Sequence, residues 1–521
     1  MNERKFTKTL PGKNLISKYL PNVYETKIPW WPFIIAGVIL SAILGAATSL
    51  GDVLPSSYVI AGIAGIFVSV IILQKPELGA YILIISVFTN ISDILTDRGF
   101  PSINRPLIAV TIGSVLVNYL LKTGRYNQFP TLTRLEWTLI AFYIAIIVSV
   151  LVSPDKSNAF SVILDITKDI LVGVSIYITL NTEEHWKKGV SVLLITITIL
   201  AAMGVFKTAT GSDITFFDLA RNSAFGQVSY GELRYGGPIE EPNLWGQVLV
   251  SSLPFVLYHL RLEQRSTRKV LIVFSMFTIL LAMIYTGSRG AIVALAAIVP
   301  LLAIDMKIKP VSLLIGFLLF ISLLSVLPAS YSQRFQSLNV FFQPKDEAAL
   351  NQDESIIGRR AVMLTGLAMF KENPMFGVGF GNYGLRYWEF ATDLGLEANA
   401  ININYGPKSR YAHSLYVEIL SETGLFGFLM FLLFFLTLFT EMLRIRKIFN
   451  AYAIQTNWSS WATALSMSIL TFLISGIFLH GIFFRYIWIL IGLAMAAISI
   501  SDSTDASNQT APAHQKPGYG N

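Results

Sequence analysis

Long apolar stretches alternate with short polar stretches along most of the chain, and this pattern predicts helices that cross a membrane. Each apolar stretch is roughly 17 to 21 residues long, which fits a hydrocarbon core of about 30 Å. A backbone in lipid must satisfy its own hydrogen bonds, so helices are favoured over strands. We place about fourteen spans. They cover 29–49, 56–73, 78–95, 105–121, 135–152, 160–180, 189–207, 243–260, 270–286, 290–304, 311–328, 414–441, 459–480 and 485–500.

The stretch 78–95 is the weakest of these spans. Asn90 and Asp93 interrupt it within the sequence FTNISDIL. Polar side chains at membrane depth need partners in the protein or in water. We therefore interpret 78–95 as either a span or a re-entrant or interfacial piece. With the uncertainty of the other edges, we expect about twelve to fourteen spans in total.

Composition supports an all-α polytopic membrane protein. Hydrophobic residues make up 53% of the 521 residues and charged residues only 14%, which is more apolar than a soluble core of this length requires. The formal net charge is +7, but Lys and Arg concentrate in alternate loops, as on the cytoplasmic side of a membrane. A nucleic-acid-binding function is not indicated, because the basic residues form no single solvated face. With no cysteine, disulfides and thiolate chemistry are excluded.

The loop charges also predict an orientation in the cytoplasmic (inner) membrane, with both termini inside. Residues 1–28 form a cytoplasmic tail, and 29–328 form transmembrane helices with an external segment near 208–242. Residues 329–412 form a large external loop, 413–500 the C-terminal transmembrane helices, and 501–521 a disordered tail. The two long external segments therefore face the same compartment.

Four basic residues reach the outer interface in this topology: Arg234, Arg289, Arg359 and His413. Arg289 lies in TGSRGA, where small neighbours let a helix or a bulky headgroup approach closely. The alternative for Arg289 is a snorkelling arginine at a helix end. Their convergence on one face is the main prediction about a site.

Several nearby residues have both a structural and a functional interpretation. Asn243 follows Pro242 at a predicted helix start and resembles a residue that caps the first turn. Lys207 lies at the outer end of its span and either contacts a phosphate or snorkels. Asp165, Lys168 and Asp169 share one helical face and can neutralise one another, as a structural or a functional group.

The large external loop contains two recognisable patterns. From Arg359 onward, RRAVMLTGLAMF has the apolar spacing of an amphipathic helix on a surface. The glycines of NPMFGVGFGNYG then predict a tight turn rather than a phosphate site, since no Walker lysine is present. Beyond the loop, Glu422 is more consistent with a structural hydrogen-bond acceptor than with a base partner of His413.

The chain resembles the O-antigen ligase and polysaccharide polymerase family of integral-membrane glycosyltransferases. The resemblance rests on RYGGPIEEPN, TGSRGA, GRR with LAMFKENPMFGVGFGNY, and HSLYVEILSETGLFG, and it covers about 220 to 450. Ser414 stands where the family often has Asn, and the pair Arg359 and Arg360 leaves the position of the family's loop arginine open.

The resemblance implies transfer of a glycan from a polyprenyl diphosphate carrier to a hydroxyl acceptor on the outer face of the membrane. Arg234 and Arg289 would hold the diphosphate, because guanidinium is a permanent and bidentate partner for phosphate. His413 would act as general base. Direct attack would invert the anomeric configuration, and neither a metal ion nor a cofactor is expected. Further candidates for binding diphosphate or glycan are Arg359, Arg360, Asn243, Ser288 and Lys207.

The sequence leaves two questions of function open. A ligase and a polymerase share the donor chemistry and differ in the acceptor, which is a glycan, a lipid core or another hydroxyl compound. A transporter or flippase of lipid-linked oligosaccharide would also need many helices and cationic patches. The absence of an evident internal repeat disfavours the transporter.

Overall fold

The computed structural model describes residues 56–122, 132–153, 156–223, 234–326, 354–396, 411–451, 457–479 and 485–510. The predicted span 29–49, the tail 1–28 and residues 511–521 lie outside the described residues.

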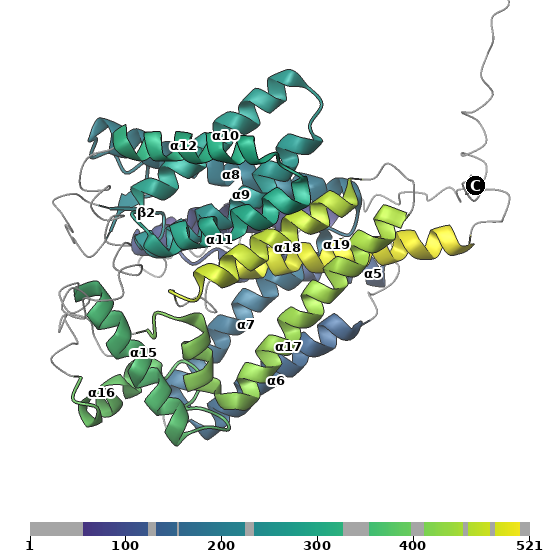
Figure 1. The fold of residues 1–521 in the computed structure, drawn as a ribbon. Coiled ribbons are helices and arrows are strands. Elements are labelled where there is room, and N and C mark those ends of the chain that lie inside the picture. Colours follow the sequence, from purple (N-terminus) through teal and green to yellow (C-terminus); the bar gives the residue numbers. More distant parts are fainter. Residues whose placement is uncertain are drawn as a thin grey trace, which may run out of the picture.

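The described chain is almost entirely helical, which confirms the predicted all-α class (Figure 1). Every predicted apolar stretch within the described residues coincides with a helix or, at 78–95, with a pair of helices. The helices are α2 Ser56–Gln74, α3 Pro76–Thr89, α4 Ile91–Asp97, α5 Asn104–Leu120, α6 Arg134–Val152, α7 Lys156–Thr179, α8 Glu183–Thr210, α9 Pro242–Leu262, α10 Ser266–Tyr285, α11 Arg289–Met306, α12 Pro310–Val326, α15 Glu354–Glu372, α16 Tyr383–Asp393, α17 Leu415–Ala451, α18 Trp458–Ser475 and α19 Arg485–Thr510. Two short antiparallel strands, β1 Arg221–Asn222 and β2 Tyr235–Gly237, accompany them.

Several helices are suited to cross a bilayer, as expected for a multi-pass membrane protein. Among the described residues, six combine sufficient length with apolar composition: α6, α8, α10, α11, α17 and α19. The pair α3 and α4 qualifies as a seventh, bent by 63°. The remaining helices are shorter or carry more polar residues, so length and composition alone assign fewer crossings than the twelve to fourteen predicted.

The bend between α3 and α4 lies at the polar interruption that the sequence displays. Asn90 ends α3 with a left-handed backbone, at φ 51° and ψ 24°. Asparagine tolerates this conformation better than most residues, because its short side chain bonds locally. The stretch 78–95 is therefore a broken helix, which is compatible with a broken span and with a re-entrant piece.

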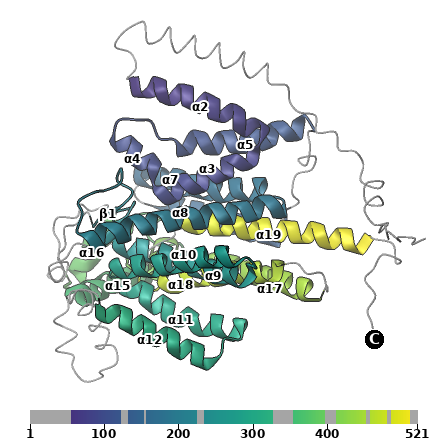
Figure 2. The same cartoon turned by 90° about the horizontal axis from the view of Figure 1, so that it is seen from above.

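The core forms around α19, which runs through the middle of the helical body (Figure 2). Trp186 of α8 packs against Trp458 and Trp461 of α18, with ring centroids 5.0 and 5.8 Å apart. Its indole nitrogen donates a hydrogen bond of 2.9 Å to the carbonyl oxygen of Leu493 in α19. A buried indole with a partner gives large apolar area without an unsatisfied donor, so α8, α18 and α19 form a rigid frame.

The structure differs from the expected disordered tail at residues 501–510, where α19 continues to Thr510. Ser501 is buried. Arg444 of α17 donates a hydrogen bond of 2.7 Å to Asp502. The polar composition suggested disorder, but this contact with α17 extends the helix.

The segments predicted to lie outside the membrane gather at one end of the body. Both views place β1 or β2, α15 and α16 at the same end of the body, opposite the last turns of α17 and α19 (Figures 1 and 2). The candidate residues of the sequence analysis belong to this end.

The helix α17 is broken at Gly424, close to this end. Gly424 has φ 65° and ψ −167°. The amide nitrogens of Leu425 and Phe426 donate to the carbonyl oxygens of Pro374 and Met375, at 2.8 and 3.2 Å. The loop after α15 thus completes the backbone hydrogen bonds that the break in α17 leaves open.

We expect Gly424→Ala to destabilise the protein by about 1–3 kcal/mol or more, because an alanine there is strained. A methyl group on Gly424 would also lie 2.4 Å from the carbonyl carbon of Met375. Thermal unfolding in lipid nanodiscs measures the change. Gly113→Ala is the control, since nothing lies within 4 Å of a methyl group at that position. Equal melting temperatures for the two variants would contradict the prediction.

Candidate functional site

Arg234 connects two of the sequence motifs. Its Nε donates to the carbonyl oxygen of Thr286 at 2.9 Å, and its Nη2 donates to Oδ1 of Asn243 at 2.8 Å. Thr286 belongs to TGSRGA and Asn243 to RYGGPIEEPN. The structure therefore brings Arg234 to the turn that carries Arg289.

The TGSR turn joins α10 to α11. Ser288 is the N-cap of α11, and its hydroxyl oxygen accepts a hydrogen bond of 3.3 Å from the amide of Ala291. The Ser288 side chain is thus a helix cap, not only a candidate contact for a substrate. Arg289 is the first residue of α11, where amide groups and the helix dipole favour an anion.

Asn243 has a different local role from the one that its position suggests. The N-cap of α9 is Glu241, whose Oε1 accepts from the amide of Asn243 at 3.0 Å. The prediction that Asn243 caps this helix is wrong, because Glu241, the residue before the helix, accepts the amide hydrogen bond of the first turn with its side chain. Asn243 instead lies between Glu241 and the guanidinium of Arg234, and it orients that arginine.

His413 lies just before α17, and backbone contacts bring it towards Arg289. The amide of Leu415 donates to the carbonyl oxygens of Gly476 and Leu479, both at 2.8 Å. A methyl group on Gly290 would lie 3.4 Å from Cβ of Phe478 in the same turn. The turn 476–479 after α18 therefore contacts the start of α17 and the start of α11, and with them the segments of His413 and Arg289.

The charge of Arg359, on α15, acts on His413. Burial, and then the positive charge of Arg359, lower the pKa of His413 to about 4. Arg359 is half-buried, whereas Arg360 is exposed. Of the two arginines, Arg359 is thus the one close to the candidate base.

Lys207 is engaged in a structural contact. Its Nζ donates a hydrogen bond of 3.0 Å to the carbonyl oxygen of Ala220, and the residue is only 6% exposed. Ala220 directly precedes β1, so Lys207 links α8 to the segment predicted to lie outside the membrane. Neither a snorkelling side chain nor a phosphate is needed to account for this lysine.

The glycine-rich loop has the geometry of a turn. The amides of Val378 and Gly379 donate to the carbonyl oxygens of Ser421 and Glu422, at 2.9 and 3.1 Å. Oε1 of Glu422 accepts a hydrogen bond of 3.0 Å from the amide of Tyr383. These contacts support the turn interpretation of the loop and the structural role expected for Glu422.

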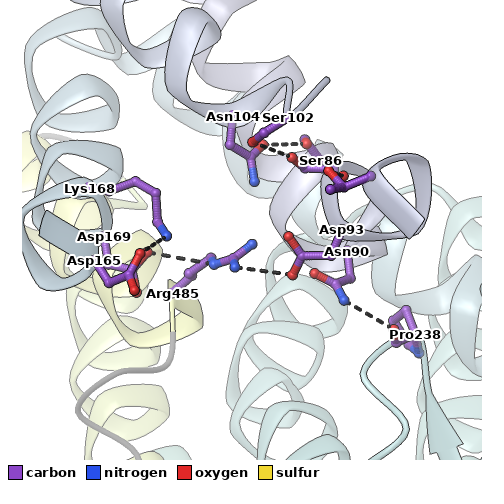
Figure 3. Close-up of polar contacts among 12 residues, drawn as sticks. Ser86, Asn90, Asp93, Ser102, Asn104, Asp165, Lys168, Asp169, Pro238 and Arg485 are labelled. Carbon is purple, nitrogen blue, oxygen red and sulfur yellow. Dashed lines mark hydrogen bonds and ion pairs between the residues drawn. The ribbon is translucent and has the colours of Figure 1, made fainter. Parts of the chain in front are cut away.

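An ion-pair network that sequence reasoning missed lies next to this end of the molecule (Figure 3). Arg485 of α19 lies between Asp93 of α4, at 3.1 Å, and Asp169 of α7, at 3.6 Å. Lys168 donates to Asp165 at 2.8 Å. Of the three residues predicted to pair on α7, Asp169 thus forms its ion pair with Arg485 of another helix. The polar residues inside apolar stretches were the available signal, but the partner of Asp169 is more than three hundred positions away in the chain.

Comparison with known proteins identifies part of the chain. Residues 274–432 match the family model described as O-antigen ligase, which confirms the family resemblance predicted from the motifs. No curated protein matches the chain at a significant level. The matched residues include TGSRGA, α15, the glycine-rich loop and His413.

Proposed function

Because residues 274–432 match the family model described as O-antigen ligase, we propose that the protein transfers a glycan from a polyprenyl diphosphate carrier to a hydroxyl acceptor outside the cytoplasmic membrane. Arg234 and Arg289 bind the diphosphate, Arg359 adds positive charge near it, and His413 is the general base. The family match supports glycosyl transfer of the ligase or polymerase type in a membrane.

The observation that carries this proposal is the arrangement around the turn 476–479. That turn contacts the helix start that bears Arg289 and the segment that bears His413. Arg234 donates to Thr286, three residues before Arg289. Cations for a leaving group and a base for a nucleophile therefore lie at one end of the bundle.

The chemistry follows from these groups. His413 takes the proton of the acceptor hydroxyl, whose oxygen forms a bond to the anomeric carbon of the donor sugar. The bond between that carbon and the phosphate oxygen breaks, and its electron pair leaves with the diphosphate. The arginines stabilise the charge that develops there. Attack from the face opposite the leaving group inverts the anomeric configuration.

An assay with purified protein in lipid tests this function. The donor is the host's own polyprenyl diphosphate-linked glycan, the acceptor is the host's membrane glycolipid fraction, and EDTA is present. We expect free polyprenyl diphosphate together with a longer or relocated glycan of inverted configuration. A ladder of products indicates a polymerase, and a single relocation indicates a ligase. Glycan that crosses the membrane unchanged would support the transporter instead, and dependence on a metal would contradict the mechanism.

The pH dependence of the reaction should follow His413. Its pKa of about 4 means that the base form predominates above that pH, so kcat/KM should be level near neutrality and fall only in acid. Arg359→Gln removes a positive charge and should move this fall to higher pH. A bound diphosphate offsets the same charge, so kcat should begin to fall at higher pH than kcat/KM. Loss of kcat/KM below the ordinary histidine pKa of about 6.5 in the wild type would contradict the prediction.

A further inference from the structure

A polar cavity lies beside the candidate catalytic segment. It has a volume of about 330 Å³ and lies between α7, α16, the start of α17 and the start of α19. This volume is at the lower end of the range for small-molecule pockets, roughly 300–1,000 Å³. Gly381, Gly384 and Tyr411, from the segment predicted to lie outside the membrane, contribute to its wall. The cavity therefore lies at the same end as the arginines and His413.

Glu418 points to a ligand in this cavity. The residue is 1% exposed and lines the cavity. Neither carboxylate oxygen has a hydrogen-bond partner among the described residues, and the same is true of Oε2 of Glu422. Buried acceptors are normally satisfied by protein, water or ligand. A group that donates hydrogen bonds completes the site.

The charges of the cavity wall indicate the class of ligand. Acidic and basic side chains both line it: Asp165, Asp169, Glu418, Glu422, Lys168 and Arg485. Figure 3 shows Lys168 and Arg485 beside the two aspartates. Carboxylates accept hydrogen bonds and cations donate them, so the wall fits hydroxyl groups, which do both.

The position of the cavity relative to His413 indicates which substrate it serves. The segment 411–418 contacts the turn next to Arg289 through the amide of Leu415. The same segment lines the cavity through Tyr411 and Glu418. Residues on both sides of His413 in the chain therefore line the cavity, on the same segment that contacts the turn beside Arg289.

We infer that this cavity binds a sugar ring of the acceptor glycan and presents its hydroxyl to His413. The inference rests on the proposed function. It assigns Glu418 as an acceptor of hydrogen bonds from that sugar, with Lys168 and Arg485 as donors to it. Tyr411 supplies an aromatic face for the ring.

Direct binding tests the cavity without relying on turnover. The probe is the water-soluble glycan released by mild hydrolysis from the host's acceptor glycolipids, titrated against full-length protein in nanodiscs. We expect Glu418→Gln to weaken its binding about 10- to 100-fold. Inorganic pyrophosphate should bind equally well to this variant, whereas Arg289→Ala should weaken pyrophosphate and leave the glycan unaffected. Glu389→Gln, on the exposed side of α16, is the control and should match the wild type.

A second variant, Asp165→Asn, tests the same cavity if Glu418→Gln does not fold. Asp165 lines the cavity and is 55% exposed, so Asp165→Asn should fold and weaken glycan binding about fivefold. In the transfer assay, both variants should raise KM for the acceptor at saturating donor and leave KM for the donor within twofold.

The outcomes separate this inference from the proposed function. Unchanged glycan binding in both variants would overturn the cavity assignment even if transfer proceeds. Specific glycan binding that is lost in the variants, in a protein without transferase activity, would support the cavity and refute the proposed reaction.

Discussion

Replacement of His413 by glutamine should lower kcat for glycan transfer about 10²- to 10⁴-fold, the usual contribution of a general base. Glutamine resembles imidazole in size and keeps a polar group, but it cannot take a proton at neutral pH. Burial and Arg359 keep the wild-type imidazole neutral, so the variant has the same net charge at pH 7. Donor binding should therefore change little, and the loss should lie in the chemical step. The transfer assay together with pyrophosphate titration measures both quantities.

The control for this substitution is His259→Gln. His259 packs edge-on against Trp461 at 5.7 Å and lies in the last turn of α9, away from Asn243 in its first turn. The His259→Gln variant should retain the wild-type kcat. Equal activity of the two variants would exclude His413 as the base, and loss of pyrophosphate binding in His413→Gln would indicate a structural role instead.

The positions of the helices could be predicted from the sequence because apolar stretches of sufficient length have few alternatives in a bilayer. Even the break at Asn90 had a local signal, since Asn90 and Asp93 interrupt their apolar stretch. The continuation of α19 into the polar C-terminal residues had no local signal in the sequence. There Asp502 accepts a hydrogen bond from Arg444 of α17, a different helix. Contacts between distant helices decide such ends, and hydrophobic periodicity does not contain them.

The candidate site was predictable to a similar extent. Topology alone predicted that Arg234, Arg289 and His413 lie on one face, because Arg234 belongs to a predicted external segment and Arg289 and His413 lie at predicted outer ends of apolar stretches. Their coupling through Thr286 and the turn 476–479 required the tertiary structure. The cavity beside Glu418 was not predictable, since its wall combines residues from α7, α16, α17 and α19.

Local geometry also distinguishes the roles of Arg234 and Arg289, which the sequence does not. Arg234 donates to Thr286 and Asn243 and thereby supports the architecture of the site. Its removal would disturb the TGSR turn as well as any bound diphosphate. Arg289 follows a cap made by Ser288, and that cap does not depend on the arginine side chain. Arg289 is therefore the better probe of anion binding.

Replacement of Arg289 by alanine should lower kcat about 10²- to 10³-fold, the range observed when one fixed donor to a developing negative charge is removed. The leaving diphosphate gains charge in the transition state, so kcat should fall more than KM for the donor rises.

Arg289→Lys keeps the charge but loses the bidentate geometry, and we expect it to recover about a tenth of wild-type activity. Ser288 still caps α11 in both variants, and thermal unfolding is measured alongside to separate a loss of stability from a loss of catalysis. Arg268→Ala is the matched control, because Arg268 is 59% exposed at the start of α10, far along that helix from TGSR. An alanine variant at Arg289 that transfers glycan as fast as Arg268→Ala would remove Arg289 from the diphosphate site and assign it to anchoring the helix end at the membrane surface.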